Sequence, residues 1–132
     1  MGIDLGAPAG TPVFSFSACT LYSLGTNTGD GNYGPTLITE QIVRGERIWA
    51  LYGHLSATSL LDKKPGQTLE AGTIIGWLGE PSENGGWPPH VHFQLSRNQP
   101  DGFDMPGAVS ATNRTQALLD YPDPRTVLGP LY

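Results

Sequence analysis

The chain has 132 residues, 38% of them apolar, and a formal net charge of −5 with only seven Lys and Arg. This length suits one domain with one core, and the apolar content argues against an intrinsically disordered chain. Scattered cations form no basic patch for a phosphate backbone, so we exclude nucleic acid as a partner. No apolar run of about 18 residues exists, so we exclude membrane insertion.

Short apolar runs are separated by turn residues along the whole chain, which contains 18 Gly and 12 Pro. This regular punctuation predicts an all-β fold. The connecting segments begin with a loop over 6–12. They continue with a turn over 25–34, a helical turn over 55–61 and an irregular loop over 80–89. A short helix is expected near 114–119, in a Pro-rich tail. The expected strands, in chain order, are 13–16, 18–24, 36–43, 47–52, 73–78 and 90–95, with 36–43 and 47–52 forming a hairpin.

Two of the three histidines, His90 and His92, stand two residues apart in the last expected strand. Side chains alternate along a strand, so both imidazoles point to one face, while Val91 and Phe93 point to the other, toward a core. The pair could hold a metal, or it could form the polar face of a half-exposed strand. The Pro-Pro turn before His90 fixes where the strand begins, at a loop rim where functional sites tend to lie.

Two further residues are candidates for the same chemistry. His54 follows the strand 47–52, where a histidine is either an ordinary surface or core residue or a functional one. Asp4 lies between two apolar residues, as a cap or turn former or as a metal ligand. A catalytic zinc requires three protein ligands plus water, and Asp4 with one histidine of the pair supplies two of them.

Four motifs extend this interpretation beyond composition and spacing. They are GIDLGAPAGTPV at 2–13, LYGHLS at 51–56, PGQTLEAGTIIG at 65–76 and HVHFQ at 90–94. In this order and spacing they resemble the motifs of the lysostaphin-type zinc metallopeptidases, which cleave peptides of bacterial peptidoglycan. The resemblance covers about residues 2 to 96.

The resemblance implies a fold, a cofactor and a role for each candidate residue. The fold would be an antiparallel β-sheet groove with long loops over 1–98, with 99–132 as a C-terminal extension or linker packing on it. Asp4 and His92 would bind Zn²⁺, and His54 and His90 would serve as general base and electrostatic partner of the metal-bound water. The substrate would be a peptide of the peptidoglycan type, with Trp87 and Tyr52 as wall residues unless they are buried.

The chain departs from the family pattern at the metal site. The family's first ligand is a histidine four residues before the aspartate, and that position falls just before residue 1. Three explanations stay open: the sequence begins one residue too late, an added upstream residue supplies the ligand, or the site is defective.

The loop 80–89 is a second departure, because the family's Gly-rich approach to the His-x-His motif is shorter. Its sequence, NGGWPPHVHFQ, with Tyr121–Pro124 in the tail, resembles a variant fused to kinase-like and class III aminotransferase domains. Fused neighbouring domains would then be partners. No signal peptide is visible, and the compartment stays open. A fusion to cytoplasmic enzymes would place the domain in the cytoplasm.

Three functions follow from these observations. The domain is a zinc peptidase, or a catalytically inactive peptidase-like module that binds a ligand, or a structural spacer within a larger multidomain enzyme. An upstream histidine separates the first from the second. Convergence of Asp4, His54 and His90 in space separates both from a spacer, which needs no such convergence.

Overall fold

The computed structural model describes residues 2–105 and 114–128. Most described residues outside loops lie in an antiparallel six-stranded sheet with the order β1-β8-β5-β4-β3-β6. Its strands are β1 Ile3–Gly6, β3 Cys19–Asn27, β4 Gly34–Val43, β5 Glu46–Gly53, β6 Thr68–Leu69 and β8 His90–Ser96. A smaller sheet pairs β2 Pro12–Phe14 with β7 Ile74–Trp77, and the helical segments are η1 Ala57–Leu60, α1 Arg114–Asp120 and α2 Arg125–Leu128. The expected all-β antiparallel class is confirmed.

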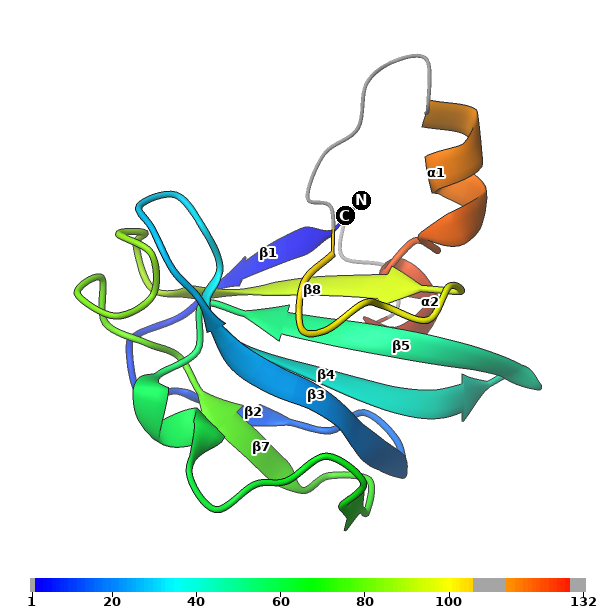
Figure 1. The fold of residues 1–132 in the computed structure, drawn as a ribbon, viewed down its shortest axis with the longest axis horizontal. Helices are drawn as coiled ribbons and strands as arrows, with labels where there is room; N and C mark the ends of the chain where they lie inside the picture. The colour runs from blue at the N-terminus through cyan, green and yellow to red at the C-terminus, as the bar shows by residue number, and fades with distance from the viewer. Residues whose placement is uncertain (1, 106–113, 129–132) are drawn as a thin grey trace.

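Strand alternation divides the large sheet into two apolar faces. On β5, Ala50 and Tyr52 point to one face, where they join Phe93 of β8 and Ile75 of the small sheet in the main core cluster. The small sheet therefore closes this face (Figure 1). Burial of these side chains supplies most of the hydrophobic stabilisation of the domain.

The opposite face of the sheet is covered by the chain that follows β8. Residues 97–105 turn back across this face (Figure 1), and Met105 packs in a second core cluster with Ile38, Trp49 and Leu51. The hydroxyl of Tyr22 also donates to the carbonyl of Pro100 at 2.5 Å. The division at residue 98 stays a prediction, although residues 99–105 contact the sheet directly.

Most expected elements are present, with shifted ends. The hairpin of β4 and β5, the helical turn η1, the strands β2, β7 and β8, and the helix α1 all occur where the pattern predicts them. The turn after β3 is shorter than expected because β3 continues to Asn27. The strands β1 and β6 and the helix α2 were not predicted.

No helix within the described ranges has the length and apolar character that crossing a membrane requires.

Candidate active site

Strand pairing brings Asp4 of β1 beside the two histidines of β8. Asp4 is the direct partner of His92, and Gly6 is the partner of His90. An oxygen of Asp4, Oδ1, lies 2.9 Å from Nδ1 of His92 and 3.7 Å from Nε2 of His90. The predicted orientation is confirmed, because both imidazoles face one side of the sheet while Val91 and Phe93 are buried in the core.

His54 joins this group from the end of β5. Its backbone has φ of 61°, a left-handed conformation that costs a residue with a side chain about 1–2 kcal/mol. The backbone N–H of His54 donates to the carbonyl of Tyr33 at 2.6 Å, which holds this conformation. The ring centroid lies 4.3 Å from that of His90 and 6.3 Å from that of His92. Asp4 and the three histidines therefore converge, which a mere spacer does not require.

Two backbone carbonyls determine which nitrogen carries the proton in His54 and His90. Nδ1 of His54 lies 2.8 Å from the carbonyl oxygen of Asn84, and Nδ1 of His90 lies 2.7 Å from that of Pro88. A carbonyl oxygen only accepts, so each Nδ1–H donates and each neutral ring keeps a lone pair on Nε2. Burial lowers the pKa of His54 below its usual range, which favours the neutral ring.

These side chains line a cleft of about 570 Å³. The strands β1 and β8 form its floor, and the turn after β3, the loop 80–89 and the end of segment 97–105 form its walls. The lining residues are Asp4, Gly31, Asn32, Tyr33, His54, Trp87, His90, His92, Asp104 and Met105.

Of the two aromatic residues considered for the walls, only Trp87 lines the cleft, with 41% of its surface exposed. Tyr52 is 3% exposed and packs in the main core, because its position on β5 points toward the small sheet. The general tendency of aromatic side chains to be buried therefore holds for Tyr52.

Sequence reasoning missed several residues of this cleft, above all Tyr33, Asp104 and Met105. The ring centroid of Tyr33 lies 4.9 Å from that of His92. Burial, followed by the charges of Asp104 and Asp4, raises the pKa of Tyr33 to about 12, so its hydroxyl keeps its proton. These residues lie in a turn and a loop without periodicity, and no pattern in the sequence marked them.

The group that could hold a metal is small. Imidazole nitrogen and carboxylate oxygen are the donors that zinc prefers, and Asp4 and His92 place one of each 2.9 Å apart. Among the described residues, no set of three or more His, Cys, Asp or Glu is arranged to hold a metal ion. The pair could supply two of the three protein ligands that a catalytic zinc requires.

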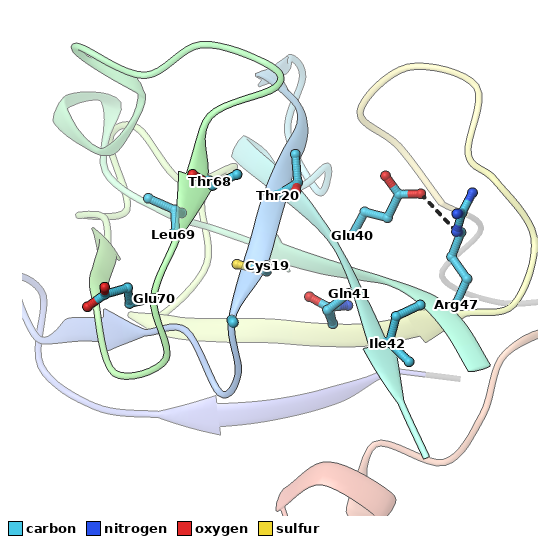
Figure 2. A pocket seen from close by; sticks show the side chains of 10 residues that line it. Cys19, Thr20, Glu40, Gln41, Ile42, Arg47, Thr68, Leu69 and Glu70 are labelled. Atoms are coloured by element: carbon cyan, nitrogen blue, oxygen red, sulfur yellow. Dashed lines mark ion pairs between the residues drawn. The ribbon is translucent and has the colours of Figure 1, made fainter. Parts of the chain in front are cut away.

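A second hollow, of about 630 Å³, lies where the ends of β3 and β4 meet β6 (Figure 2). Its charged lining includes Glu40 and Arg47, which pair with each other at 3.4 Å (Figure 2). Cys19 also lines it, but burial raises the pKa of this thiol and makes it a poor nucleophile. No histidine occurs among its described lining residues, so the candidate chemistry lies in the histidine cleft.

Comparison with known proteins shows to which family the chain belongs. The family model of Peptidase family M23 matches residues 1–103. Glycyl-glycine endopeptidase ALE-1 of Staphylococcus capitis is 36% identical over 98 residues, which cover 74% of this chain and 24% of that protein. DD-carboxypeptidase/endopeptidase Mpg of Neisseria meningitidis serogroup B is 29% identical over 116 residues, or 88% of this chain and 24% of that protein. The chain thus spans about a quarter of the length of these relatives.

The fold also matches a solved structure of the same kind. It is a catalytic-domain variant of EnpA, a prophage-encoded M23 protein of Enterococcus faecalis, with a TM-score of 0.60 and 28% identity. The alignment covers 81% of this chain and 78% of that one. The expected fusion to kinase-like and aminotransferase domains is not tested by these matches and stays a prediction. With the family model covering most of the chain, the protein belongs to peptidase family M23 and contains a lysostaphin-type peptidase domain.

Proposed function

We propose that this domain is a zinc-dependent peptidase that hydrolyses peptide bonds in peptides of the peptidoglycan type. The observation that carries the proposal is the convergence of Asp4, His92 and two histidines with free Nε2 lone pairs in one cleft. The relatives support the substrate class, since one is named a glycyl-glycine endopeptidase and another a DD-carboxypeptidase/endopeptidase.

Asp4 and His92 would hold the zinc ion, with a third ligand from a histidine four positions before Asp4. When bound, zinc supplies a Lewis acid and lowers the pKa of its water to about 7.

In this proposal, His54 is the proton acceptor. Its Nε2 carries the lone pair that can accept a proton, because Nδ1–H is donated to the carbonyl of Asn84. The same carbonyl also stabilises the ring after Nε2 gains a proton. His90, 4.3 Å away between ring centroids, orients the reacting groups through its own Nε2. Tyr33 and Trp87 both pack against the ring of His54, with ring centroids 5.7 and 5.8 Å away.

The direct test is hydrolysis of a glycine-rich cross-bridge peptide and of purified peptidoglycan by the chain, alone and extended by one histidine before Met1. New amino termini should appear with added zinc and disappear with a chelator. His54→Ala should reduce the rate by about 10²–10⁴-fold, the range for loss of a positioned base. Asp101→Asn, which changes an exposed carboxylate elsewhere, is the control and should leave the rate unchanged. No cleavage by either form would contradict the proposal.

One observation favours a second candidate, a peptidase-like module that binds without cleaving. Within the described residues only two zinc donors stand at coordination spacing, and two ligands hold zinc weakly. This candidate predicts that the same peptides bind in the cleft, with Trp87→Ala weakening binding, and that no new amino termini form in either form of the chain.

A further inference from the structure

Gln94 lies two residues beyond His92 on β8, so both side chains point to the same face of the sheet. It is fully buried, and its Oε1 lies 3.0 Å from Nε2 of His92. A buried amide at this distance from the second nitrogen of a candidate metal ligand is a specific arrangement, because a buried polar group is costly unless it is hydrogen-bonded.

The second polar neighbour of Nε2 is also an acceptor. The hydroxyl oxygen of Tyr33 lies 3.5 Å from Nε2 of His92, and its own proton is donated to the carbonyl of Met105 at 3.2 Å. The oxygen of Tyr33 therefore offers lone pairs to the imidazole. Two oxygens that accept on this side of the ring favour a proton on Nε2.

The proton on Nε2 determines what the opposite nitrogen presents. Nδ1 of His92 then directs a lone pair at Oδ1 of Asp4, 2.9 Å away. Two lone pairs at this distance repel each other unless a cation, either a proton or a metal ion, lies between them. The carboxylate of Asp4 is 64% exposed, so water and ions can reach this position, whereas Gln94 is fully buried.

We propose that Gln94 is a positioning residue that accepts a hydrogen bond from Nε2–H of His92, and so keeps Nδ1 directed at Asp4 as a ligand for a divalent metal. This inference rests on the proposed zinc site and assigns Gln94 no contact with substrate. Outer partners of this kind change metal affinity by about 10–100-fold when they are removed from other metal sites.

The first experiment measures zinc affinity by competition with a coloured chelator. The chain is compared with Gln94→Leu, which removes the acceptor at similar volume, and with Gln94→Glu, which keeps an acceptor in place. Gln94→Leu should bind zinc about 10–100-fold more weakly, and Gln94→Glu should restore binding. Equal affinities of a folded Gln94→Leu variant and the unchanged chain would overturn the inference.

The matched control is Gln41→Leu. Gln41 is also nearly fully buried in the large sheet and donates to the carbonyl of Ile48 at 2.8 Å, on the main-core face away from His92. Gln41→Leu should lower the thermal stability about as much as Gln94→Leu does, and it should leave the zinc affinity unchanged. A loss of zinc affinity in Gln41→Leu equal to that in Gln94→Leu would mean that general destabilisation explains both, and would also overturn the inference.

The second experiment needs no metal and separates this inference from the proposed function. Nitrogen-15 NMR of the metal-free chain reports which ring nitrogens of His92 carry protons. A proton on Nε2 that exchanges slowly with water, and faster in Gln94→Leu, supports the inference. A ring protonated on Nδ1 alone overturns it. If zinc fails to bind while Nε2–H is present, the proposed function fails and the role of Gln94 as hydrogen-bond acceptor stands.

Discussion

At the residue scale, His54 is held in place by its backbone conformation, its burial and a hydrogen bond. Its backbone is left-handed, the residue is 4% exposed, and its Nδ1 bonds to the carbonyl of Asn84. A residue with a side chain holds such a conformation only where the surroundings enforce it, and such strain gathers at functional sites. The fold therefore fixes the direction of the free Nε2 before any substrate arrives.

The buried ring of His54 predicts a pH dependence of stability. Burial lowers its pKa in the folded state, so the unfolded chain takes up the proton first as the pH falls below about 6.5. The stabilisation is complete above that pH and is lost as the pH falls toward the lowered pKa. Urea unfolding between about pH 7.5 and 5 should show a shallower loss of unfolding free energy in His54→Gln than in the unchanged chain. Parallel curves would contradict a buried neutral His54.

A second prediction at the residue scale concerns Gly2 and zinc binding. A Cβ at Gly2 would collide with the imidazole of His92, which Asp4 and Gln94 hold in place. Gly2→Ala should therefore displace the ring and weaken zinc binding by about tenfold or more, measured by chelator competition. Gly6→Ala, at the far end of β1, is the control, because a Cβ there meets no atom within 4 Å. Equal zinc affinities of the two variants would show that the ring moves aside freely.

Among the elements, the loop 80–89 positions more of the site than any strand except β8. Asn84 is fully buried, and its amide donates to the carbonyls of Gly79 and Trp87 while its Oδ1 accepts from the N–H of Trp87. Its backbone carbonyl orients His54. Asn84 thus fixes the loop and the wall residue Trp87 with its side chain, and the ring of His54 with its backbone carbonyl.

Asn84→Ala should lower the free energy of unfolding by about 1–3 kcal/mol, because buried partners lose their hydrogen bonds. Chemical denaturation measures this effect. The same variant should reduce peptide hydrolysis more than zinc binding, since it releases Trp87 and His54 but leaves Asp4 and His92 in place. Asn98→Ala, at an exposed asparagine, should change neither quantity. A neutral Asn84→Ala would show that the loop is held in some other way.

The elements also show which parts of the site the sequence could predict. The alternation His-Val-His-Phe in β8 predicts the side chains on each face, because the period of two is local. The strand β1 was not predicted, because it has four residues and its partner β8 lies almost 90 residues later in the chain. Asn84 and Tyr33 could not be found either, since their positions depend on contacts between loops. Motif resemblance, not periodicity, linked Asp4 to His92 before the structure did.

At the scale of the whole molecule, the cleft depends on what covers the second face of the sheet. Met105 is 5% exposed and packs with Ile38, Trp49 and Leu51, and together with Asp104 it completes one wall of the cleft. Residues 99–105 therefore complete the site, although the sequence places them in an extension.

Two shortened chains test this dependence. A chain that stops after Asn98 should lose about 2 kcal/mol or more of unfolding free energy, since it removes the buried side chain of Met105. A chain that stops after Met105 should lose less and keep its zinc affinity. Thermal and urea unfolding of both measure the difference. Equal stability of the two would mean that residues 99–105 do not belong to the folding unit.

The zinc affinity of the chain, compared with that of a form that carries one histidine immediately before Met1, tests the proposed metal site. The extended form should bind one zinc ion per chain tightly, and the unextended chain should bind it far more weakly. In the extended form, Asp4→Ala or His92→Ala should return the affinity to the weak value, because each removes one of three ligands. If neither form binds zinc above background, the proposed zinc site of Asp4 and His92 is wrong.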